Sequence, residues 1–160
     1  MNGASGAFEI RGLKYAKGEF SPFRWGDAEA VKFTGGSGTP PGLRLLDVNQ
    51  DGHADILVFN AFGPPSLFLS QAQGPPVKYE KGLGPLASAA ASSLSVAKLD
   101  GQPTLLVAQN TVARSVLLDS VKGWQVKDQY NPGRSGTQIQ GVAVLDVDGD
   151  GGQEVILWDR

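Results

Sequence analysis

The stretch Asp146-Val147-Asp148-Gly149-Asp150-Gly151-Gly152-Gln153-Glu154 carries acidic side chains at its first, third, fifth and ninth positions and glycine at its sixth. Apolar runs flank it at 142–145 and 155–158. Carboxylates at alternate positions of a curled loop converge on one point, and the glycine allows the sharp turn. Hard oxygen ligands without Cys or His favour calcium over zinc or copper. The stretch therefore predicts a Ca²⁺ loop.

The same pattern occurs earlier, as Asp47-Val48-Asn49-Gln50-Asp51-Gly52-His53-Ala54-Asp55, between apolar runs at 43–46 and 56–59. An ordinary Asp/Gly turn is the alternative for one such loop, but two copies in matching contexts favour a metal site. An EF-hand loop needs a carboxylate at position 12 and a helix afterwards. Position 12 is Val58 in one copy and Leu157 in the other, and a strand-like run follows each loop, which disfavours the helical motif.

Asp-Gly steps recur about every 50 residues, at Asp51, Asp100 and Asp150, and indicate an internal repeat. The middle copy has a single carboxylate and Thr104 at the ninth position, so we expect a metal-free β-turn there. Each full repeat contains four strand-like pieces, as a propeller blade requires. The expected strands are 43–47, 55–60, 66–71 and 76–80 in the first full copy, and 93–98, 104–109, 114–120 and 124–130 in the second.

The predicted fold class is all-β: a partial β-propeller of about three four-stranded blades, with half blades at both ends. Residues 7–20 are expected to be the last two strands of a blade, because the pattern Lys-Tyr-x-Lys-Gly at 14–18 is repeated at 78–82. The other expected segments are an inserted loop at 21–42, a blade with a metal loop at 43–82, a blade without one at 93–130, and the first two strands of a blade with a metal loop at 138–160.

Propellers typically have about four to eight blades, so three predict either a piece of a larger propeller or a homo-oligomer that completes the ring. Paired half blades would also remove exposed sheet edges. The inserted loop carries Phe23, Arg24 and Trp25, which either grip a ligand or, in the plainer interpretation, cover one end of the core.

Composition and charge restrict the function. The chain has 22 Gly, 10 Pro and no Cys, which is typical of a turn-rich all-β protein without disulfides. Its net charge is −2, but seven of its 16 acids lie in the two loops; the other nine against 14 Lys and Arg leave about +5 elsewhere. Basic runs and apolar runs of spanning length are absent, so we expect neither nucleic-acid binding nor membrane insertion.

The loop pattern, recurring once per four-stranded unit, resembles the FG-GAP and VCBS repeats of integrin-like β-propellers over about residues 43–160. The resemblance implies one Ca²⁺ bound by side chains of Asp47, Asn49, Asp51 and Asp55 with the carbonyl of His53, and another bound by Asp146, Asp148, Asp150 and Glu154 with the carbonyl of Gly152. Asn49 lowers the charge of the first site, and a Glu replaces the usual ninth-position Asp in the second. We therefore expect tighter binding at the second, unless the longer Glu disturbs its geometry.

Such proteins are mostly extracellular, periplasmic or on the cell surface, and they serve as adhesion or ligand-binding modules. Catalytic motifs are missing: His53 is the only histidine, no Gly-x-Ser-x-Gly elbow or P-loop occurs, and the carboxylates are better explained as ligands. We therefore expect a non-catalytic, calcium-stabilised module that binds a protein or a glycan. The alternative is the propeller portion of a polysaccharide lyase or hydrolase, for which Arg24, Lys98 and Arg134 are the only loose basic candidates.

Overall fold

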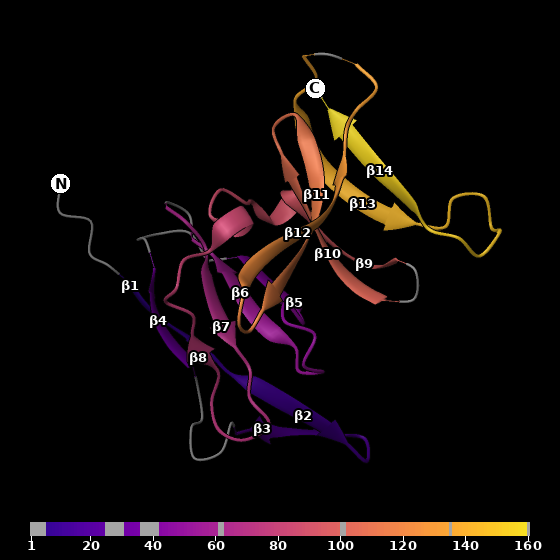
Figure 1. The fold of residues 1–160 in the computed structure, drawn as a ribbon. Coiled ribbons are helices and arrows are strands. Elements are labelled where there is room, and N and C mark those ends of the chain that lie inside the picture. The colour runs from indigo at the N-terminus through magenta and orange to yellow at the C-terminus, as the bar shows by residue number, and fades with distance from the viewer. Residues whose placement is uncertain are drawn as a thin grey trace.

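The computed structural model describes residues 6–24, 31–35, 42–60, 63–99, 102–134 and 136–159. These residues form antiparallel β-sheets joined by turns and two short 3₁₀ helices, η1 (Gly84–Leu86) and η2 (Ala91–Ser93), as Figure 1 shows. The prediction of an all-β fold is confirmed. The sheets described do not close into a ring. None of the helices in these ranges has the length and apolarity needed to cross a membrane.

Two four-stranded sheets form the centre of the molecule, and each follows the chain order in a meander. The first contains β5 (Gly42–Leu46), β6 (Asp55–Phe59), β7 (Ser66–Leu69) and β8 (Val77–Lys78). The second contains β9 (Leu94–Leu99), β10 (Gln102–Gln109), β11 (Val112–Asp119) and β12 (Gly123–Tyr130). All eight strands coincide with predicted ones, although β7 and β8 are shorter than expected.

Three two-stranded sheets complete the described fold. Near the C-terminus, β13 (Ile139–Leu145) pairs with β14 (Glu154–Asp159). At the N-terminal end β1 (Gly6–Ile10) pairs with β4 (Val31–Gly35), and β2 (Gly12–Ala16) pairs with β3 (Glu19–Phe23).

The N-terminal pairing corrects two expectations. Residues 7–20 were expected to be two paired strands of one blade, but they divide between two sheets. The reason is the turn at Lys17 and Gly18, whose φ angles of 53° and 87° both lie in the left-handed region, as a tight hairpin turn requires. This turn folds β3 back onto β2 and leaves β1 to pair with β4. The segment 21–42 is therefore not only an inserted loop, since it contains β4; Trp25 and residues 36–41 lie outside the described ranges.

Apolar side chains fill the spaces between successive sheets. Strand β6 is buried along its whole length because its side chains alternate between two cores, as the two-residue period of a strand dictates. Leu57 packs toward the second four-stranded sheet in the largest cluster, while Ile56 and Val58 pack with Phe68 and Ile10 on the opposite face. A third cluster joins the other face of the second sheet to the β13–β14 pair. The two four-stranded sheets and the β13–β14 pair thus stack face to face in chain order (Figure 1).

Candidate metal loops

The two acidic loops occupy equivalent places in the fold. Residues 47–54 join β5 to β6, and residues 146–153 join β13 to β14, so each loop connects the first two strands of its sheet. A strand follows each loop directly, which confirms the prediction that set these loops apart from helical calcium motifs. The corresponding turn of the middle copy, at 100–101, lies outside the described residues.

The loops share one backbone conformation. Their sixth residues, Gly52 and Gly151, have φ angles of 86° and 89°, and their fourth residues, Gln50 and Gly149, have φ angles of 58° and 80°. Both positions therefore adopt the left-handed conformation in both loops. Gln50 does so without the freedom of glycine, at a cost of about 1 to 2 kcal/mol. Because Gln50 adopts this conformation despite its cost, the two loops share a shape that does not come from their glycines alone.

The first-position aspartates wrap around the loop backbone in the same way. The backbone N–H of Gly52 donates to Oδ2 of Asp47 at 2.9 Å, and that of Gly151 donates to Oδ2 of Asp146 at 2.9 Å. The other carboxylate oxygen of Asp47 accepts from the N–H of Asp51 at 3.1 Å. Each aspartate thus holds the turn closed and places its charge at the centre of the loop.

The fifth-position aspartates also match. Oδ1 of Asp51 accepts from the N–H of His53 at 2.8 Å, and Oδ1 of Asp150 accepts from the N–H of Gly152 at 2.6 Å. The second oxygen of Asp51 accepts from the side-chain amide of Asn49 at 2.9 Å. The third-position side chains match as well: Oδ1 of Asn49 accepts from the N–H of Asp51 at 3.3 Å, and Oδ1 of Asp148 accepts from the N–H of Asp150 at 3.2 Å.

The ninth position distinguishes the loops. The carboxylate of Asp55 is fully buried; its Oδ2 accepts from the N–H of Val48 at 3.0 Å and its Oδ1 from the N–H of Ser70 at 2.8 Å. Burial raises the pKa of Asp55 to about 6, helped by the charges of Asp51 and Asp47 and opposed by the two hydrogen bonds. Through these two hydrogen bonds, Asp55 links the start of the first loop, at Val48, to Ser70 at the end of β7.

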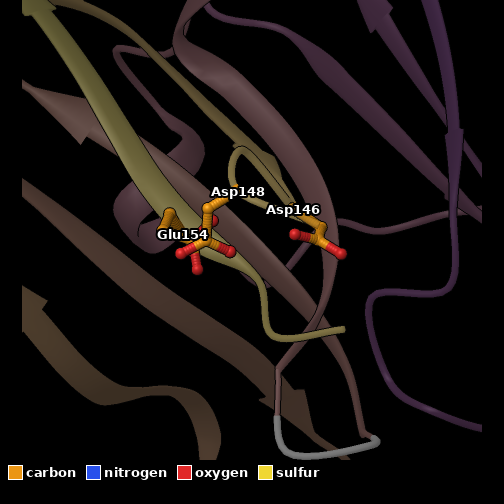
Figure 2. Close-up of side chains that lie close together, drawn as sticks. All are labelled: Asp146, Asp148 and Glu154. Atoms are coloured by element: carbon orange, nitrogen blue, oxygen red, sulfur yellow. The ribbon is translucent and has the colours of Figure 1, made fainter. Parts of the chain in front are cut away.

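Among the residues that the structure describes, Glu154 makes only the first of these two hydrogen bonds. Its Oε2 accepts from the N–H of Val147 at 2.8 Å, as Asp55 accepts from Val48. Asp146, Asp148 and Glu154 each place a carboxylate oxygen within 4.8 Å of the others, at the exposed end of the β13–β14 pair. Figure 2 shows the side chains of Asp148 and Glu154 next to each other with Asp146 beside them. Oxygens that bind one Ca²⁺ at about 2.4 Å lie no more than about 4.8 Å apart, and these three carboxylates meet that limit.

No family model, curated protein or solved structure matches this chain. The resemblance to FG-GAP and VCBS repeats therefore stays a prediction, carried by the two loops and their places in the sheets.

The predicted ligands do not all converge. The structure brings Asp146, Asp148 and Glu154 together and leaves Asp150 outside that group, although all four also accept from backbone N–H groups of the loop. In the first loop, Asp55 faces backbone donors with both oxygens. The carbonyl oxygens of His53 and Gly152 stay predicted ligands. The side chain of His53 is exposed.

Ser70 is the residue of this site that the sequence did not indicate. Its N–H binds Asp55, and its hydroxyl donates to the carbonyl oxygen of Ala54 at 2.6 Å. It follows β7, 15 residues after the acid it contacts. A lone serine at a strand end carries no sequence signal for such a contact, because only the pairing of β6 with β7 brings the two together.

Proposed function

We propose that this chain is a calcium-stabilised, non-catalytic segment of a β-propeller that serves as a binding module, an adhesion or scaffold element for a protein or glycan ligand outside the cell. The observation that carries the proposal is the repetition of one loop conformation 99 positions apart, from Asp47 to Asp146, between the first two strands of a sheet each time. A repeated loop with alternating carboxylates is what a repeated oxygen-ligand cation site requires.

Calcium has a structural role in this proposal. The oxygens of Asp146, Asp148 and Glu154 lie close enough for like charges to repel by roughly 1 to 4 kcal/mol per pair at partly exposed positions. A divalent cation replaces that repulsion with attraction and fixes the turn between β13 and β14. Because the ion binds the folded loop in preference to the unfolded chain, it raises the free energy of unfolding by mass action.

The two loops would differ in affinity. The last loop offers three converging carboxylates, while the first has the neutral Asn49 at its third position and the carboxylate of Asp55 directed toward backbone donors. Fewer available negative charges mean a weaker calcium site. The proposal therefore assigns the tighter site to the last loop.

The propeller part of the proposal is supported by the stacking of sheets. Two four-stranded meanders pack face to face, and the β13–β14 pair packs on the next face in the order of the chain. Face-to-face stacking of four-stranded sheets is the packing of propeller blades. Additional strands, from a longer chain or from a second copy, would complete the ring and cover the partly exposed Ile156 and Trp158 of β14.

Calcium titration of chelator-treated protein by calorimetry, combined with thermal unfolding, tests the proposal. We expect at least one bound calcium per chain and a higher melting midpoint, with about 2.7 kcal/mol of added stability when free calcium is 100 times the dissociation constant. The double variant Asp146→Asn, Asp148→Asn should lose the tighter site while keeping its strands. Identical midpoints with calcium and with chelator would refute the structural role of the ion.

A further inference from the structure

A groove of about 620 Å³ lies between the outer strands of the two four-stranded sheets. One wall is formed by the ends of β7 and β8 and the residues that follow up to Lys81, and the other by the end of β11, the turn after it and the start of β12. Its volume falls within the range of roughly 300 to 1,000 Å³ that is usual for small-molecule sites. It is separate from the carboxylate triad of the last loop.

The floor of the groove is apolar and rigid. Tyr79, Leu118 and Trp124 line it and also belong to or pack against the largest core cluster. The indole N–H of Trp124 donates to the carbonyl oxygen of Gly82 at 3.1 Å. The ring also lies so close to Gly84 that a Cβ there would stand 2.5 Å from it. Trp124 is therefore held from two sides and presents a preformed aromatic surface to the groove.

The rim carries three lysines, Lys78, Lys81 and Lys122, against two carboxylates, Glu80 and Asp119, and so has a net positive charge. Lys78 pairs with Glu80 at 3.1 Å, and Asp119 accepts from two backbone N–H groups of the β11–β12 turn, which lower its pKa. Lys81 and Lys122 have no ion-pair partner among the residues that the structure describes. Lys81 and Lys122 thus line the same groove from opposite walls.

Uncharged polar groups complete the lining. The side-chain amide of Gln71 and the hydroxyl of Ser120 form no hydrogen bond with the described part of the chain, so both are available to a ligand. Asn49, the third residue of the first metal loop, stands at the edge of the groove. Amide and hydroxyl groups beside aromatic faces suit a ligand that is both hydroxylated and hydrophobic on its C–H faces.

We propose that this groove binds an acidic saccharide, a short sugar chain carrying carboxylate or sulfate groups. The aromatic floor contacts the C–H face of a sugar ring, the amide and hydroxyl groups bind its hydroxyls, and Lys81 and Lys122 bind its anionic groups. An acidic peptide would satisfy the lysines and the amide, but a segment of Asp and Glu offers no ring face to the aromatic floor. This inference deepens the proposed function and rests on it only in treating the chain as a binding module.

Calorimetry and NMR on the whole chain test the proposal, with a sulfated uronic-acid disaccharide as the probe. The comparison ligands are the same disaccharide without sulfate, lactose, inorganic sulfate and triglutamate. We expect the sulfated probe to bind, removal of its sulfate to weaken binding about three- to ten-fold, and lactose to bind more than about ten-fold more weakly. The indole N–H signal of Trp124 should shift on binding. Equally tight binding of lactose, inorganic sulfate or triglutamate would overturn the proposal.

Charge-removing variants locate the site. Lys81→Gln and Lys122→Gln should each weaken binding of the sulfated probe about three- to ten-fold, because each removes one ammonium without altering the core. Lys14→Gln removes an exposed lysine on β2, away from the groove, and should bind as the parent protein does. An equal loss in all three variants would mean that the probe responds to overall charge, and the groove would be excluded.

The measurements also separate this inference from the proposed function, since each is repeated in calcium and in chelator. Calcium binding without binding of any saccharide would remove the groove proposal and leave the metal role standing. Saccharide binding by a chain that takes up no calcium would do the reverse.

Discussion

The backbone N–H of Leu118 donates to the carbonyl oxygen of Val48 at 2.8 Å, which joins the end of β11 to the first metal loop. The side chain of Val48 is only 1 % exposed in the core between the two four-stranded sheets, whereas Val147, its equivalent in the last loop, is 60 % exposed. The loops therefore have the same internal geometry and different surroundings. The first is held by the neighbouring sheet, and the last depends on its own contacts.

Calcium removal should therefore loosen the last loop more than the first. We expect amide hydrogen exchange at 146–153 to accelerate strongly in chelator, because carboxylate repulsion there is opposed only by contacts within the loop. At 47–54 the change should be several-fold smaller. Mass spectrometry of deuterium uptake with and without calcium measures both, and a larger change in the first loop would contradict the prediction.

Replacement of Val48 should lower the free energy of unfolding, and replacement of Val147 should leave it almost unchanged. Val48→Ala leaves a cavity in a closely packed core and should lower the free energy of unfolding by about 1 to 3 kcal/mol. Val147→Ala, the matched control, should change it by less than about 0.5 kcal/mol, since that side chain stands in solvent. Denaturant unfolding of the pair in chelator measures the difference, and equal effects would argue against the burial seen here.

Asp55 should contribute more to stability than the other acids of its loop. Asp55→Ala leaves the buried N–H groups of Val48 and Ser70 without an acceptor and should destabilise the protein by about 2 to 4 kcal/mol. Asp51→Ala, at an exposed position, should cost less than about 1 kcal/mol in the absence of calcium. The comparison is made in chelator so that lost metal binding does not contribute. A smaller effect at Asp55 than at Asp51 would contradict the prediction.

The stability of the calcium-free protein should carry a pH dependence from Asp55. Burial raises the pKa of this carboxyl from 3.8 to about 6, so the folded state holds the proton more tightly than the unfolded chain does. The stabilising contribution of this proton is therefore fully present below pH 3.8 and is lost as pH rises through about 6. Carboxyl NMR titration in chelator should give the raised midpoint. The Asp55→Asn variant should lose this pH-dependent part of the stability. An NMR titration midpoint near 3.8 for Asp55 would refute its raised pKa.

Much of the central fold follows from local sequence. The two four-stranded meanders lie where alternating apolar residues are separated by turn residues, since a strand and its turn are specified by neighbouring side chains. The N-terminal pairing was predicted wrongly because the echo between 14–18 and 78–82 concealed a hairpin turn at Lys17 and Gly18. Nothing in the local sequence strongly signals the left-handed backbone conformation of Lys17. The strand that pairs with β1 lies 21 or more residues away along the chain.

Local sequence specifies the curled shape of both acidic loops, because glycine at the sixth position and aspartates that accept from nearby N–H groups act within nine residues. The packing of the sheets is what buries Asp55 against Ser70 while Glu154 stays partly exposed, and what places a groove beside Trp124. These features depend on which sheet packs against which face. Such packing arises from burial of apolar area, which has no direction along the chain and so leaves no local pattern.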